Sequence, residues 1–169
     1  MDYISGLELR AGDVLAASRL GGIYEHYAVY IGGGRIIHYA AESGDFAGRI
    51  SIHEADYDAF ERGTTAVCAL DFPDAQGRFA GPVLHGHVPA TALNEALFFD
   101  VIRDSLYHLY TPAETVARAR SRLGEEKYSL PFNNCEHFAV WCKTGVHESH
   151  QVNRWATLVG KLIASAQKG

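Results

Sequence analysis

Cys135 is the residue of this sequence best placed to act as a nucleophile, because it stands at the predicted start of an apolar helix. Asn133 and Asn134 are strong helix N-cap residues, and Pro131 disfavours helix at Leu130. A cysteine in the first helical turn faces the positive end of the helix dipole and unpaired backbone N–H groups, which favour thiolate over thiol. Cysteine is also a common core residue, so the position predicts a nucleophile only if a base lies beside it.

Two of the nine histidines, His26 and His38, are predicted to lie on one face of a β-hairpin. Residues 25–32 and 35–41 are rich in aromatic and β-branched types, and the glycines between them suit a tight turn. A turn centred on those glycines pairs His38 with Ala28. Because residues of equal parity share one face of a strand, the two imidazoles become diagonal neighbours.

Together these residues predict a Cys–His–His triad, in which His26 takes the proton from Cys135 and His38 holds the first imidazole in the right tautomer. For either histidine alone, a half-buried strand residue bonded to a backbone carbonyl is the simpler interpretation. A zinc site is another alternative, but no C-x-x-C or H-x-x-x-H spacing joins the three residues. His137 is predicted to point away from the sulfur, either supporting the site or exposed, and Cys142 is expected to pack in the core.

Length and composition narrow the possible functions. The 169 residues predict one domain, and the net charge of −5 gives no sign of a nucleic-acid partner. The three cysteines are an odd number, and no basic-then-apolar leader precedes them, so we expect a reducing, cytoplasmic compartment without disulfides. No apolar run approaches the length that a membrane-spanning helix needs.

The order of the predicted elements, strands first and helices after, is typical of an α+β domain. The sharpest helix signal is a capping box at Thr111 and Glu114 with Pro112 between them, and Gly124 is predicted to end that helix. Besides the hairpin, the patterns predict a lead-in at 2–10, strands at 14–17, 50–52 and 64–70, a helical turn at 54–60, an irregular stretch at 72–89, and helices at 92–109, 112–123 and about 135–145.

The last segment, residues 152–166, has an apolar stripe that includes Trp155, with basic residues opposite. Such a helix can dock on its own domain. A basic amphipathic helix that carries tryptophan can also lie in a membrane interface, which would make the protein membrane-peripheral. The sequence leaves both alternatives open.

Several stretches together resemble the lecithin:retinol acyltransferase family, which includes the HRAS-like suppressor phospholipase/acyltransferases and bacterial relatives. The resemblance covers roughly residues 9–41 and 112–146. The matching strings are AGDVL at 11–15, YEHYAVYIG at 24–32, IIH at 36–38, YSL at 128–130, NNCEHF at 133–138 and KTG at 143–145.

This resemblance implies a circularly permuted papain-like fold, a small antiparallel sheet packed against helices with the nucleophile at a helix N-terminus. It implies Cys135 as nucleophile, His26 as base and His38 as its orienting partner, without a cofactor. The expected chemistry is a thioester formed from a lipid ester, followed by acyl transfer to an alcohol, an amine or water. Tyr24 and Asn134 are expected to support the oxyanion.

The sequence also departs from the family. Residues 72–110 have no counterpart that we can place, so we expect a family-atypical insertion within a single domain spanning 1–169. In place of the membrane-spanning anchor of vertebrate members, we expect at most the amphipathic helix at 152–166. These departures weaken the transfer of lipid specificity but do not affect the triad. Two other functions stay open because one fold hosts several activities: a cysteine amidase or peptidase of the same fold, and a non-catalytic binding module.

Overall fold

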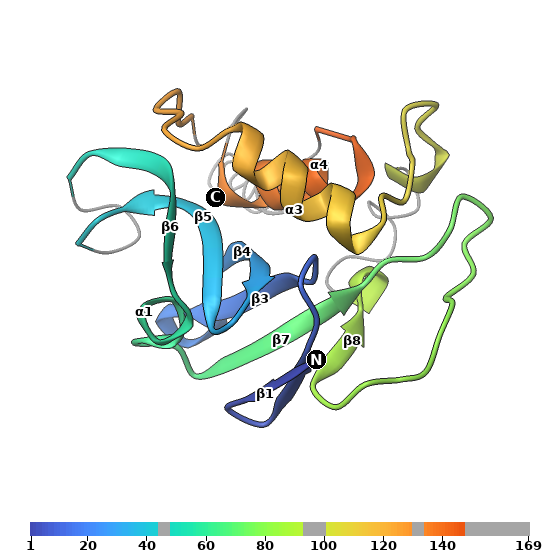
Figure 1. The fold of residues 1–169 in the computed structure, drawn as a ribbon, viewed down its shortest axis with the longest axis horizontal. Coiled ribbons are helices and arrows are strands. Elements are labelled where there is room, and N and C mark those ends of the chain that lie inside the picture. Colours follow the sequence, from blue (N-terminus) through green and yellow to red (C-terminus); the bar gives the residue numbers. More distant parts are fainter. Residues whose placement is uncertain (44–47, 93–100, 130–133, 148–169) are drawn as a thin grey trace, which may run out of the picture.

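The computed structural model describes residues 1–43, 48–92, 101–129 and 134–147 (Figure 1). Its main feature is a six-stranded sheet in the order β6-β5-β4-β3-β7-β8, antiparallel except for the β7–β8 pair. A separate small hairpin pairs β1 with β2. The strands are β1 Asp2–Ile4, β2 Leu7–Leu9, β3 Val14–Arg19, β4 Tyr24–Gly32, β5 Arg35–Ala41, β6 Ile50–Asp56, β7 Ala66–Asp71 and β8 His87–Pro89.

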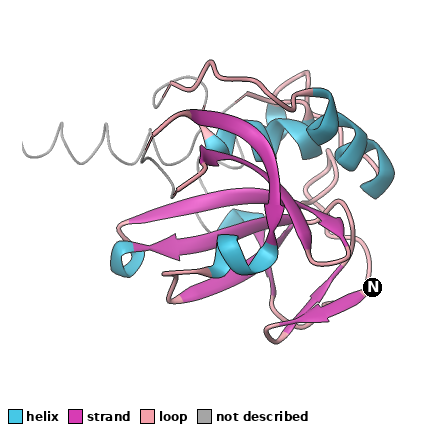
Figure 2. Ribbon diagram, turned by 60° about the vertical axis from the view of Figure 1, so that its left-hand side comes forward, coloured by secondary structure: helices cyan, strands magenta, loops and turns pink. Residues whose placement is uncertain are grey.

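Helices cover both faces of this sheet. Figures 1 and 2 show α3 (Pro112–Ser121) and α4 (Cys135–Thr144) lying together on one face, with the short α1 (Tyr57–Glu61) well away from them. Two separate core clusters result, since alternate residues of each strand point to opposite faces. The α+β class predicted from the sequence is therefore confirmed.

The central hairpin has the predicted register. Ala28 of β4 lies opposite His38 of β5, and a bulge follows at Tyr30/Gly32. β5 pairs with β6 along its whole length, from Arg35 to Ala41, but with β4 only from Arg35 to His38, while β4 pairs with β3 from Tyr24 to Val29. His38 is therefore the last residue of β5 that pairs with β4, and it is paired with β6 on its other side.

The helix α3 begins with the predicted capping box. Glu114 N donates to Thr111 Oγ1, and Thr111 N donates to Glu114 Oε2 at 2.9 Å. Pro112 occupies the first helical turn, and Gly124 has the left-handed φ of 84° expected after a helix. The helix itself stops at Ser121, slightly before the predicted end.

Arg118 joins α3 to α4. Its guanidinium lies over the rings of Tyr110 and Trp141, at 4.1 Å and 3.8 Å from the centroids, and Nη2 donates to the Trp141 carbonyl at 3.0 Å. Stacking on two rings, together with a hydrogen bond to a carbonyl oxygen, gives this long charged side chain a structural role between two helices. Both helices are thereby held as a unit on the sheet.

Some predicted elements differ in the structure. The stretch at 2–10 is not a plain lead-in but the β1–β2 hairpin, which turns through the left-handed residues Ser5 and Gly6. The strand predicted at 50–52 runs on to Asp56, because pairing with β5 holds it extended, and the helical turn begins only at Tyr57. The stretch at 72–89 ends in β8, parallel to β7.

The predicted helix at 92–109 is only partly visible. Residues 93–100 lie outside the described part of the chain, residues 101–103 are helical, and the chain from Asp104 to Leu109 is not. The amphipathic helix predicted at 152–166 also lies outside the described residues. Within the described ranges, no helix has the length and apolar character needed to cross a bilayer.

Candidate active site

His26 and His38 form a buried pair between β4 and β5. Nε2 of His26 lies 3.0 Å from Nδ1 of His38, and the side chains are 1% and 6% exposed. The Phe60 ring of α1 packs against both imidazoles. The sequence prediction that the two rings lie within reach of one another is therefore confirmed by a direct ring–ring hydrogen bond.

Burial determines the protonation of His38. It lowers the pKa of this imidazole well below the ordinary value, and the nearby His26, His53 and Arg19 lower it further. A low pKa means that the ring stays neutral at physiological pH. A neutral ring has one N–H and one lone pair, as a hydrogen-bonded relay requires.

Acid should destabilise this fold through His38. Below the unfolded-state pKa of 6.5, His38 binds a proton in the unfolded chain but not in the folded one. The free energy of unfolding therefore decreases as the pH is lowered. We expect His38→Gln to remove this contribution, which amounts to at most about 1.4 kcal/mol per pH unit. Urea unfolding of both proteins from neutral to mildly acidic pH measures the difference. Exposed His85→Gln is the control and should keep the wild-type dependence of the unfolding free energy on pH. The same dependence in His38→Gln as in wild type would contradict the low pKa assigned to His38.

Cys135 is the first residue of α4, and the cap before it matches the sequence prediction. Asn134 Oδ1 accepts from His137 N at 3.0 Å, and Asn134 N donates to His137 Nδ1 at 3.4 Å. His137 is only 4% exposed, so the exposed alternative is wrong for it: the ring points back to close the cap. Cys135 thus lies in the first turn of a capped helix, where N–H groups concentrate.

The helix that carries Cys135 packs on the strand that carries His26. Cys135 is 2% exposed and belongs to the same core cluster as Tyr27, the residue after His26. Burial raises the pKa of the Tyr27 hydroxyl well above its ordinary value, and the neighbouring Glu136 and Cys135 raise it further. Cys135 therefore lies near the start of β4 on the Tyr27 side of the sheet, whereas the ring of His26 packs against Phe60 on the α1 side.

A third imidazole, which the sequence analysis missed, extends the pair. His53 of β6 lies directly opposite His38, with the two Nε2 atoms 3.1 Å apart. Its Nδ1 lies 3.1 Å from the carbonyl oxygen of Ser51. The strand predicted at 50–52 ends one residue before His53. Had that strand been extended, His53 would have shared a face with residues 51 and 55.

Comparison with known proteins agrees with this architecture. The model of the family "Lecithin retinol acyltransferase" matches residues 7–148. The chain belongs to the lecithin retinol acyltransferase family. It is 28% identical over 162 residues to human "Phospholipase A and acyltransferase 2", covering 89% of this chain and 80% of that protein. Human "Phospholipase A and acyltransferase 4" is 27% identical, covering 93% and 83%, and rat "Lecithin retinol acyltransferase" is 28% identical, covering 90% and 62%.

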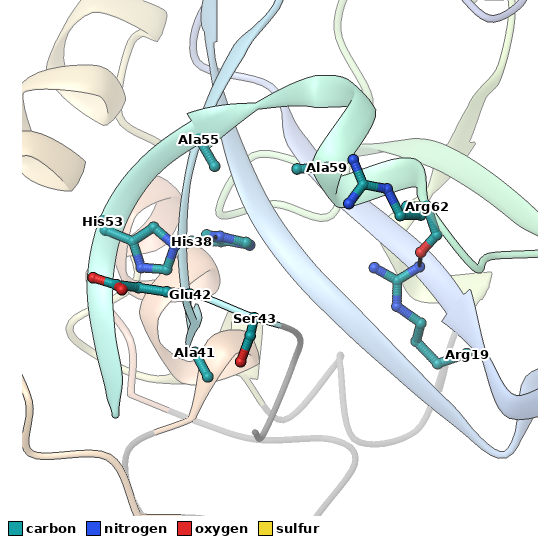
Figure 3. Close-up of a pocket in the computed structure, with 9 residues that line it drawn as sticks. All are labelled: Arg19, His38, Ala41, Glu42, Ser43, His53, Ala55, Ala59 and Arg62. Carbon is teal, nitrogen blue, oxygen red and sulfur yellow. Dashed lines mark hydrogen bonds between the residues drawn. The ribbon is translucent and has the colours of Figure 1, made fainter. Parts of the chain in front are cut away.

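A cavity of about 340 Å³ borders His38 and His53. Figure 3 shows His38 and His53 on one side of it and Arg19 and Arg62 on the other. Arg19 is held in place by carbonyls at the end of α1, since its Nη2 donates to Phe60 O at 2.5 Å and its Nη1 to Arg62 O at 3.1 Å. The far end of the histidine row therefore faces open space that is lined by Arg19 and Arg62 and also by the carboxylate of Glu42.

The two residues predicted to support an oxyanion have defined places in the fold. Tyr24 is the first residue of β4, half-buried and opposite Arg19 of β3. Asn134 is buried, and its side-chain oxygen is used as the helix cap. Their part in the chemistry stays a prediction. Among the described residues, no group of three or more histidine, cysteine or acidic side chains has the arrangement of a metal site.

The other two cysteines differ from Cys135 in position. Cys142 lies fully buried in the core, as predicted, and burial raises the pKa of its thiol far above the ordinary value. Burial also raises the pKa of Cys68, on β7, to about 11. Both thiols are therefore protonated at neutral pH and poorly nucleophilic.

Proposed function

We propose that this chain is a cysteine-dependent acyl-transfer enzyme acting on lipid esters, with Cys135 as nucleophile, His26 as base and His38 as orienting residue. The observation that supports this best is the buried hydrogen bond between His26 of β4 and His38 of β5, together with the packing of the Cys135 helix on β4. Nucleophile, base and orienting group are the parts that this chemistry requires. The permuted papain-like arrangement belongs to the same proposal.

In the first half-reaction, His26 takes the proton from the Cys135 thiol, and the thiolate attacks the ester carbonyl carbon. Backbone N–H groups in the first turn of α4 stabilise the resulting oxyanion, aided by the positive end of the helix dipole. The imidazolium of His26 then donates its proton to the departing alkoxide. The products are an alcohol and a thioester on Cys135.

In the second half-reaction, an acceptor removes the acyl group. His26 takes a proton from water, an alcohol or an amine as that acceptor attacks the thioester carbonyl, and returns it to the departing sulfur. Water gives hydrolysis and a free fatty acid, whereas an alcohol or amine gives acyl transfer. The names of the relatives, phospholipase A and acyltransferase, include both outcomes.

The proposal predicts a covalent intermediate. Incubation with a diacyl phosphatidylcholine, followed by rapid acid quenching and intact mass spectrometry, should reveal an added acyl chain. Peptide mapping should place it on Cys135, and hydroxylamine should remove it because it is a thioester. An acyl adduct on another residue would contradict the proposed role of Cys135. So would turnover of the lipid with no adduct found at any quenching time.

A further inference from the structure

The row of imidazoles does not end at His38. His26, His38 and His53 follow one another across β4, β5 and β6, with nitrogen–nitrogen distances of 3.0 Å and 3.1 Å. The row ends at the carbonyl oxygen of Ser51, 3.1 Å from Nδ1 of His53. The proposed function uses only the first two rings, so the third has no role in it yet.

The Ser51 carbonyl determines where each proton sits when the three rings are neutral. A carbonyl oxygen only accepts, so His53 must carry its proton on Nδ1 and a lone pair on Nε2. That lone pair accepts from Nε2–H of His38, which leaves the His38 lone pair on Nδ1. It in turn accepts from Nε2–H of His26, so the His26 lone pair lies on Nδ1.

We propose that His53 is a positioning residue, which fixes the tautomers of His38 and His26 so that Nδ1 of His26 is the basic nitrogen. This inference rests on the proposed function, since it concerns the base of the same site. His53 acts through His38 and touches neither the substrate nor the sulfur. His38 can hold the tautomer of His26 only if the hydrogen-bonding role of its own other ring nitrogen, Nε2, is also fixed.

The cavity explains why a third ring is needed. His38 and His53 both line the open space shown in Figure 3. Without His53, water from this cavity would reach Nε2 of His38. Water can donate or accept, so both tautomers of His38 would be populated, and with them both tautomers of His26. The hydrogen bond between His53 and the Ser51 carbonyl leaves His38 and His26 with one tautomer each.

Nitrogen NMR tests the tautomers directly. Protein labelled with ¹⁵N-histidine, studied above the ordinary histidine pKa and assigned through single His→Gln variants, should show protonated Nε2 in His26 and His38 and protonated Nδ1 in His53. In His53→Leu, the His38 and His26 signals should move toward a mixture of tautomers. A proton on Nδ1 of His38 in the wild type, or unchanged signals in His53→Leu, would overturn the inference.

Kinetics provide the second arm. His53→Leu should lower kcat by about 10-fold to 100-fold with little change in KM, by analogy with the loss found when the residue that orients a metal-bound imidazole is removed. His53→Gln, whose side-chain oxygen can accept from Nε2–H of His38, should recover most of the rate. His85→Leu makes the same change at an exposed histidine outside the row and should leave kcat unaltered.

The two proposals can fail separately. Unchanged kcat in His53→Leu, or equal losses in the Leu and Gln variants, would overturn the positioning role even if Cys135 forms the thioester. If Cys135 is not the nucleophile, the thioester is not found, while the NMR signals of His38 and His26 still report whether His53 fixes their tautomers.

Discussion

Replacing Cys135 with alanine is expected to lower turnover by roughly 10³-fold or more, because the attacking group is lost while binding is kept. The side chain is 2% exposed, so removing its sulfur costs about 1 kcal/mol of stability and leaves the fold intact. Initial rates of fatty-acid release from phosphatidylcholine vesicles measure the loss. Circular dichroism and urea unfolding check that the variant is folded.

Cys68→Ala is the matched control for this experiment. Cys68 is half-buried on β7, and its thiol has a raised pKa of about 11, so it takes no part in the proposed chemistry. Its replacement should keep turnover within about twofold, as expected for substitutions away from a site. Full activity in folded Cys135→Ala, or an equal loss in Cys68→Ala, would exclude Cys135 as the nucleophile.

Replacing His26 with alanine is expected to lower kcat by about 10²-fold to 10⁴-fold, the usual contribution of a positioned general base. The same change should slow alkylation of Cys135 by iodoacetamide at neutral pH, since the thiol loses the group that accepts its proton. His38→Ala should cost less than His26→Ala, because His38 orients the base and does not itself take the proton.

His85→Ala is the control for the His26 variant. Its ring is exposed and lies beside Tyr3, outside the row of imidazoles. It should alter neither turnover nor the alkylation rate. Retention of wild-type kcat by folded His26→Ala would remove His26 from the mechanism and leave the reactivity of Cys135 to the helix terminus alone.

Local rules were sufficient for much of the candidate site. The start of α4 follows from one asparagine cap, and the register of β4 with β5 follows from a tight glycine turn and the parity of two strands. Each of these depends on residues a few positions apart, which is the range over which backbone propensity acts. The pairing of Ala28 with His38 and the cap at Asn134 were therefore predictable.

Other parts required longer-range pairing. The parallel contact of β7 with β8 joins strands separated by an irregular stretch, which no local pattern specifies. The extent of β6 was also misjudged, because residues 53–56 are held extended by β5 and not by their own propensity. A tertiary partner outweighed the local preference in both cases.

The sequence by itself determined a thiol at a capped helix start, a histidine pair on one face of a hairpin and membership of the lecithin retinol acyltransferase family. Only the tertiary structure brought His53 against His38. The physical reason is distance along the chain: residues 42–49 separate β5 from β6 in the sequence, so no short turn pattern specifies their register, which is set by pairing across the sheet. The third imidazole could be found only once that register was known.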